Sequence, residues 1–178
     1  PNRFVINVMP DQNAMFQQRL QDAGVRGYDW YPMIRGRLVG INGRAVVPED
    51  MDDERARRLL DREFNLSTSR TLMPDNRIVA GAFWPVDGPA ETEISVEEGF
   101  ARNLGWALGD RVAFDIAGQR LDARSSSLRK VEWENFRPNF FVVVSPGALR
   151  GFPASHITAL HLPTGKPRFT AQLVARFP

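Results

Sequence analysis

The fold is decided by the stretch Ser127-Leu128-Arg129-Lys130-Val131-Glu132-Trp133 and by Pro138-Asn139-Phe140-Phe141-Val142-Val143-Val144-Ser145-Pro146-Gly147 just after it. Residues 140–144 form an unbroken apolar, β-prone run that Ser-Pro-Gly ends. Because such a run has no polar face to offer to water, it predicts a strand covered on both sides. Residues 128–133 alternate between two faces and predict a half-exposed strand with one mixed face. Neither segment carries an obvious catalytic group.

The composition is that of a soluble globular chain. It has 178 residues, 43% hydrophobic and 25% charged, which suits one domain or two small intimate lobes with a sizeable core. The formal net charge is 23 − 21 = +2, and the basic residues are scattered along the chain. Nucleic-acid binding needs clustered basic residues, so no nucleic-acid partner is predicted.

Cysteine is absent, which excludes disulfides, thiolate zinc sites and a cysteine nucleophile. No run approaches the about 20 apolar residues that span a bilayer, and no signal peptide is visible. The chain begins at Pro1 with a strand almost at once, and it ends at Phe177-Pro178 after a helix-like segment. We therefore expect a domain cut from a longer protein, with any membrane spans lying outside it.

The first third of the chain predicts a β-α-β-β order. A strand over 4–8 is followed by Pro10, which suits the first turn of a helix. Strands follow over 28–35 and 37–41, and Asn42-Gly43 is a strong signal for a type I′ hairpin turn.

The rest of the chain mixes hairpins with short helices. Ser95 and Glu98 form a predicted capping box, with Ser95 as the N-cap of a helix that Gly105 ends. A helix opened by Asp52-Asp53-Glu54, a turn at Ala117-Gly118 and a strand over 154–162 complete the pattern, which predicts the α+β class rather than a doubly wound sheet.

No catalytic, cofactor-binding or metal-binding residue is predicted. The two histidines, His156 and His161, are five residues apart on one predicted strand, so they point to opposite faces and cannot share a metal. The acidic pairs Asp52-Asp53 and Glu97-Glu98 stand at helix starts, where dipole and capping effects explain them. Ser125-Ser126-Ser127 has no nearby histidine and no strained elbow.

Trp84 is the one residue predicted as part of a partner or ligand surface. It leads into the loop Pro85-Val86-Asp87-Gly88-Pro89, where an aromatic side chain could meet a partner or a lipophilic ligand. The alternative is a core tryptophan, since most large aromatic side chains are buried.

Four segments together resemble the extracytoplasmic domain of ABC-transporter permeases of the FtsX/MacB/LolC class, and most of all the YbbP-like branch of predicted permeases. The order and spacing of these segments carry the resemblance, which covers nearly the whole chain. A softer match is the proline-then-strand ending at Phe152-Pro153-Ala154. The four segments are Phe4-Val5-Ile6-Asn7-Val8-Met9-Pro10-Asp11-Gln12, Ile94-Ser95-Val96-Glu97-Glu98-Gly99-Phe100-Ala101, Leu104-Gly105-Trp106-Ala107-Leu108-Gly109-Asp110-Arg111-Val112 and Asn139-Phe140-Phe141 through to Pro146-Gly147.

The resemblance implies a MacB-like periplasmic core domain in two lobes. Residues 1–43 and 139–178 would form a porter-like α/β lobe, and residues 44–138 an inserted β-rich lobe. The strand over 140–144 would then lie beside the strand over 4–8. The resemblance also implies that the parent protein sits in the bacterial inner (cytoplasmic) membrane, with this segment facing the periplasm.

The function that the resemblance implies is non-catalytic. A separate cytoplasmic subunit would hydrolyse ATP, and this domain would couple that hydrolysis to movement or extraction of a hydrophobic or lipid-like substrate. A periplasmic protein partner is a further expectation. The alternative is a free-standing periplasmic ligand- or protein-binding module, and a small hydrolase would need a dyad that the chain does not display.

Overall fold

The computed structural model describes residues 3–8, 10–22, 29–133, 139–152 and 154–160. The chain divides into two compact units, each described here by itself. Unit 1 comprises Pro1–Met33, Trp133–Pro138 and Pro153–Pro178, and unit 2 comprises Ile34–Glu132 and Asn139–Phe152. Both hold strands and short helices, so the α+β class is confirmed. Among the described residues, no helix has the length and apolar character needed to cross a membrane.

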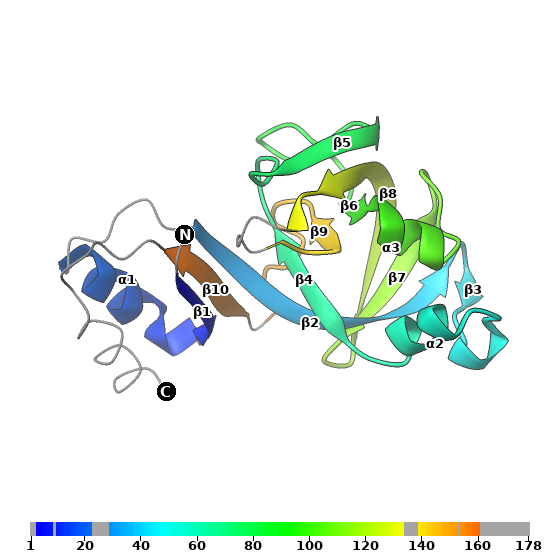
Figure 1. The fold of residues 1–178 in the computed structure, drawn as a ribbon, viewed down its shortest axis with the longest axis horizontal. Coiled ribbons are helices and arrows are strands. Elements are labelled where there is room, and N and C mark those ends of the chain that lie inside the picture. The colour runs from blue at the N-terminus through cyan, green and yellow to red at the C-terminus, as the bar shows by residue number, and fades with distance from the viewer. Residues whose placement is uncertain (1–2, 9, 23–28, 134–138, 153, 161–178) are drawn as a thin grey trace. The chain divides into compact units, whose positions relative to one another are not determined.

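Unit 1 is a small antiparallel sheet with one helix beside it (Figure 1). The central strand β10 pairs on one side with β1, with Arg3 opposite Leu160. On its other side it pairs with the first part of β2, with Ser155 opposite Met33. Phe16 on α1 is fully buried. The elements are β1 (Arg3–Val8), the 3-10 turn η1 (Pro10–Gln12), α1 (Asn13–Asp22), β2 (Asp29–Ile41) and β10 (Ser155–Leu160).

Unit 2 is built round a closed ring of six strands in the order β2-β4-β9-β6-β8-β7, with β7 returning to β2. The β4/β9 and β6/β8 pairs are parallel, and the other four are antiparallel. Strand β5 extends the sheet from β8, and β3 pairs with β2. The strands are β3 (Arg44–Ala45), β4 (Phe64–Thr68), β5 (Asn76–Gly81), β6 (Glu93–Glu97), β7 (Arg111–Ile116), β8 (Gln119–Val131) and β9 (Val142–Val144).

Two long strands, β2 and β8, close this ring because each pairs with different strands along its length (Figure 1). Strand β2 pairs with β4 at Ile34 and with β7 from Arg37 onward. Strand β8 pairs with β7 up to Arg124 and with β6 from Arg124 onward. Such stagger between neighbours is what lets a sheet close on itself. The short helices of this unit are η2 (Pro48–Asp50), α2 (Glu54–Leu60) and α3 (Glu98–Asn103).

Aromatic rings fill part of the core of unit 2. Phe64 meets Phe100 edge to face at a centroid distance of 5.2 Å and Phe114 at 5.8 Å. Phe100 also lies 6.1 Å from Trp106. Each such pair adds about 0.5–1.5 kcal/mol beyond the area that it buries.

The turns predicted at Asn42-Gly43 and Ala117-Gly118 are confirmed. The covered strand predicted over 140–144 is confirmed only for Val142–Val144, because Phe141 precedes the strand and is 37% exposed. All three residues of β9 are at most 2% exposed, because β9 lies between β4 and β6. The turns have positive φ at both central residues, as a type I′ turn requires: 52° and 79° at Asn42-Gly43, and 52° and 83° at Ala117-Gly118.

The predicted place of β9 in the sheet is wrong. It was expected beside the strand over 4–8, but β1 pairs with β10, whereas β9 pairs with β4 and β6 within unit 2. The two compact units have their boundaries after Met33, Glu132, Pro138 and Phe152. The two lobes, 1–43 with 139–178 and 44–138, stay a prediction. Residues 34–43 and 139–152 lie in unit 2, since β2 runs on into the closed ring and β9 forms part of it.

The predicted capping box is wrong as well. Strand β6 continues to Glu97, so Ser95 is a fully buried strand residue and α3 begins later. The N-cap is Glu97, whose carboxylate accepts the backbone N–H groups of Gly99 at 2.9 Å and Phe100 at 2.7 Å. A carboxylate at this position satisfies two orphan donors of the helix and suits its dipole.

We expect Glu97→Ala to lower the free energy of unfolding by about 1–2 kcal/mol, the usual cost of a lost N-cap. The matched control is Glu98→Ala, which removes a neighbouring carboxylate that makes no capping bond and should cost a few tenths of a kcal/mol by the weaker dipole effect. Urea denaturation of the 178-residue chain measures both. If Glu98→Ala lowers the free energy of unfolding more than Glu97→Ala does, this capping geometry is contradicted.

Candidate functional site

The most unusual polar feature of the molecule is a buried arginine on β8. Arg129 is 1% exposed, and its Nε donates to Ser95 Oγ at 2.9 Å. Its Nη1 donates to Asn76 Oδ1, and its Nη2 faces the carbonyl oxygens of Ser95 at 3.1 Å, Phe140 at 2.8 Å and Phe141 at 3.1 Å. Because Nη2 has two protons for three acceptors, at least one proton is shared. We call these five residues the Arg129 clamp.

Two further hydrogen bonds extend the Arg129 clamp. Ser127 Oγ donates to Ser95 Oγ at 2.7 Å. The amide Nδ2 of Asn76 donates to Asn139 Oδ1 at 2.7 Å and to the carbonyl oxygen of Pro74 at 2.9 Å. The network therefore joins strands β5, β6 and β8 to the segment that leads into β9, through side chains that are buried or half-buried.

The charge on Arg129 is stabilised mainly by the dipoles of hydroxyl and carbonyl groups. Burial lowers the pKa of Arg129 to about 10, and the Glu97 carboxylate raises the pKa and so offsets part of that effect. Among the described residues, the ion pairs involve other arginines, namely Arg111, Arg120 and Arg124. The guanidinium thus stays charged at neutral pH while carbonyl and hydroxyl oxygens solvate it.

We expect the contribution of Arg129 to stability to be independent of pH between about pH 6 and pH 9, because its pKa of about 10 lies above that range. Because folding lowers the pKa of Arg129, this residue makes stability rise with pH only above about pH 10, where the folded chain has released the proton that the unfolded chain still binds. The measurement is the difference in unfolding free energy between the wild type and Arg129→Met across this range. If this difference changes by more than about 1 kcal/mol between pH 6 and pH 9, Arg129 does not stay charged over that range.

The other polar groups of unit 2 also serve local structure. Asp110 accepts the backbone N–H of Ala107 at 2.8 Å and the side-chain amide of Asn42 at 3.1 Å, which fixes the turn before β7. Asp122 forms an exposed ion pair with Arg120 at 3.0 Å. Within the part of the chain that the structure describes, no three or more histidine, aspartate or glutamate side chains gather in a way that could hold a metal.

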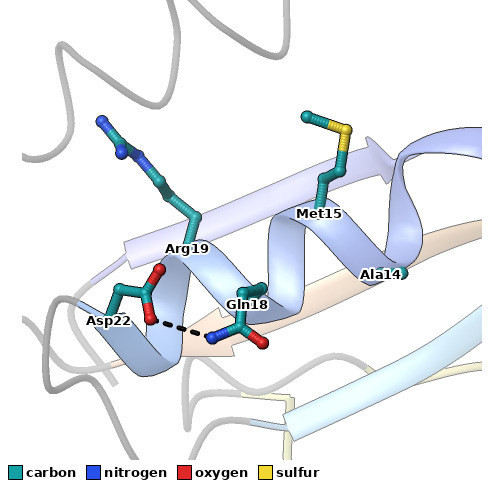
Figure 2. Close-up of a pocket in the computed structure, with 5 residues that line it drawn as sticks. All are labelled: Ala14, Met15, Gln18, Arg19 and Asp22. Carbon is teal, nitrogen blue, oxygen red and sulfur yellow. Dashed lines mark hydrogen bonds between the residues drawn. The ribbon is translucent and has the colours of Figure 1, made fainter.

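Described residues line two open hollows on the surface. Figure 2 shows the first, a groove of about 410 Å³ along α1 in unit 1, where Met15 is 54% exposed and Gln18 donates to Asp22 at 2.8 Å. Its described lining also includes Ala14 and Arg19. The second, of about 350 Å³, lies in unit 2 between the β2–β3 hairpin, the η2 segment and the turn at 105–110.

Trp84 lies in the core of unit 2. Its side chain is 4% exposed, its indole Nε1 donates to the carbonyl oxygen of Ser69 at 2.9 Å, and its ring lies 4.1 Å from that of Phe83. This burial favours the core alternative, and a part for Trp84 in a partner or ligand surface stays a prediction. Of the two histidines, His156 is on β10, and His161 lies outside the described residues.

The burial of Arg129 was not predicted, although the sequence of β8 contains a signal for it. The alternation in β8 places Arg129 on the same face as Val131, and that face is the buried one. An arginine in register with apolar neighbours needs hydrogen-bond acceptors when that face is covered. Those acceptors come from other strands, so the sequence could not name them.

Comparison with known proteins gives a sequence match along the whole chain. The chain is 40% identical over all 178 residues to the uncharacterized ABC transporter permease YbbP of Escherichia coli (strain K12), and it spans 21% of the length of that relative. No protein-family model matches the chain.

One solved structure, described as a domain of a permease protein from Porphyromonas gingivalis, covers 99% of this chain and 85% of its own, with a TM-score of 0.45 and 12% identity. At that TM-score the likeness carries no conclusion. The sequence match does confirm the predicted resemblance: over its whole length, this chain is similar to a segment of an ABC-transporter permease.

Proposed function

We propose that this chain is a non-catalytic, periplasmic domain of an ABC-transporter permease subunit. In this proposal a separate cytoplasmic subunit binds and hydrolyses ATP, and the domain couples that hydrolysis to the movement or extraction of a hydrophobic or lipid-like substrate. The observation that carries the proposal is the 40% identity over all 178 residues to a permease. An identity that extends across every segment of the chain argues for the same place in the same kind of protein.

The polar chemistry of the described residues supports a mechanical rather than a chemical role. The most elaborate hydrogen-bond network, the Arg129 clamp, joins backbone segments and presents no nucleophile beside a base. Its donors are used to hold strands together, which is what a part that transmits force requires.

The chain connectivity supports a MacB-like organisation. Unit 1 is formed from both ends of the chain and unit 2 from the middle with residues 139–152, as expected for a porter-like lobe with an inserted β-rich lobe. We infer that the intact protein is held in the bacterial inner membrane by segments outside this chain, with these residues facing the periplasm.

The test is affinity purification of the intact parent protein from detergent-solubilised membranes. We expect an ATP-binding subunit and lipid to copurify with it, and ATP hydrolysis to be lost when the nucleotide site of that subunit is inactivated. An intact protein that fractionates away from membranes, without an ATP-binding subunit, would contradict the proposal. It would favour the free-standing periplasmic binding module instead.

A further inference from the structure

The chain leaves unit 2 after Glu132 and returns to it at Asn139, and both points are tied to one turn. At the point of departure, the backbone N–H of Glu132 donates to the carbonyl oxygen of Asp75 at 3.0 Å. At the point of return, Asn139 Oδ1 accepts from Asn76, the next residue of that turn, at 2.7 Å. A force transmitted along the chain from residues 133–138 therefore acts on unit 2 at Glu132 and Asn139.

The Arg129 clamp holds the return segment directly. The carbonyl oxygen of Phe141 accepts from the backbone N–H of Glu97 at 2.8 Å, and the same oxygen accepts from Arg129 at 3.1 Å. The preceding carbonyl, of Phe140, accepts from Arg129 at 2.8 Å. Strand β9 follows immediately, and its first residue, Val142, pairs with β6. If β9 separates from β6 beginning at Val142, the hydrogen bonds from the guanidinium to the carbonyl oxygens of Phe140 and Phe141 must therefore break first.

We propose that the Arg129 clamp is a mechanical anchor, which keeps strand β9 from separating from strand β6 when force reaches unit 2 through Asn139. The purpose of the anchor rests on the proposed coupling function. The chemistry suits this task, because a planar guanidinium directs five donors in fixed directions and can hold two carbonyls, a hydroxyl and an amide oxygen at once. A lysine ammonium has three donors at one point and cannot span them.

The first test is amide hydrogen exchange on the whole 178-residue chain. In Arg129→Lys and Arg129→Met we expect the Glu97 amide to exchange at least about tenfold faster, because local opening of β9 from β6 becomes easier. Amides of the β7–β8 hairpin should change by less than about threefold. Lys130→Met is the matched control: it removes a cation from the next, exposed position of the same strand and should leave exchange at Glu97 unchanged.

The pattern of exchange decides the anchor. Unchanged protection of the Glu97 amide in both variants overturns it, and so does an equal increase over the whole of unit 2, which would make Arg129 a general core residue. If Arg129→Met fails to fold, Asn76→Ala provides the milder variant, since it removes one acceptor of Arg129 and the tie to Asn139. Faster exchange confined to Glu97 and β9 in that variant supports the anchor, and unchanged exchange overturns it.

The second test places Arg129→Lys in the intact permease with its ATP-binding subunit. We expect substrate moved per ATP hydrolysed to fall several-fold while ATP hydrolysis continues. Wild-type coupling together with selective loss of protection at Glu97 overturns the mechanical role of the anchor. If the wild-type assembly itself moves no substrate, the proposed function fails, whereas the exchange pattern still decides whether the anchor exists.

Discussion

Gly81→Ala is expected to lower the free energy of unfolding of unit 2 by about 3 kcal/mol or more. Gly81 ends β5 with a φ of +72°, a conformation that costs an L-residue about 1–2 kcal/mol. A Cβ there would overlap the carbonyl oxygen of Ser126 and lie 2.8 Å from Leu108 Cδ1. The Ser126 carbonyl cannot move away easily, because it lies within β8 and accepts the backbone N–H of Ala82 at 3.2 Å.

Thermal unfolding of Gly81→Ala followed by circular dichroism measures this effect. A chain of this size loses about 2–4 °C of Tm per kcal/mol, so we expect a loss near 10 °C. Gly118→Ala is the matched control, since Gly118 also has a positive φ, of +83°, but nothing lies within 4 Å of its added Cβ. The free energy of unfolding of that control should fall only by the cost of a positive φ at alanine, about 1–2 kcal/mol. Equal losses in the two variants would show that the close approach of β5 to β8 is not as described.

Trp84→Ala is expected to cost about 3–5 kcal/mol, the usual range for a buried aromatic side chain truncated to alanine. The indole is 4% exposed and packs on Phe83, and its N–H is satisfied by the carbonyl oxygen of Ser69. Truncation therefore removes apolar contacts and also leaves that carbonyl without its donor. Urea denaturation of the 178-residue chain provides the measurement.

Two controls separate packing from hydrogen bonding and from surface effects. Trp84→Phe keeps most of the apolar volume and loses the indole N–H, so its cost should be well below that of Trp84→Ala. Val86→Ala truncates a neighbouring side chain that is 60% exposed and should change stability by less than about 0.5 kcal/mol. If Trp84→Ala leaves the stability of the chain intact, Trp84 is not a core residue, and its predicted part in a partner surface gains support.

Features set by a few neighbouring residues could be predicted from the sequence. The Asn42-Gly43 turn follows from the need for positive φ at both central positions of a type I′ turn, and the burial of Val142–Val144 follows from their lack of a polar face. Pairing between distant strands could not be predicted in the same way. The apolar residues at 142–144 indicate a covered strand, but they do not indicate that β4 and β6 are the strands that cover it.

The two errors at the candidate site share one physical cause. Ser95 followed by Glu98 matches a capping box locally, but pairing with β8 and β9 keeps the chain extended to Glu97, so tertiary contacts override the local preference. Arg129 was not expected to be buried, because arginine is buried rarely and only with partners. Its partners lie 11 to 53 residues away in the chain, so they became visible only in the folded structure.

The proposed coupling of ATP hydrolysis to movement of a lipid-like substrate is tested most directly in proteoliposomes. The intact permease is reconstituted with its ATP-binding subunit, and ATP-dependent extraction of a fluorescent lipid is measured with residues 1–178 present or replaced by a flexible linker. Copurification of the ATP-binding subunit verifies that the shortened permease assembles. We expect lipid extraction to be lost in the shortened assembly while ATP hydrolysis persists. Lipid extraction at the full rate without these residues would contradict it.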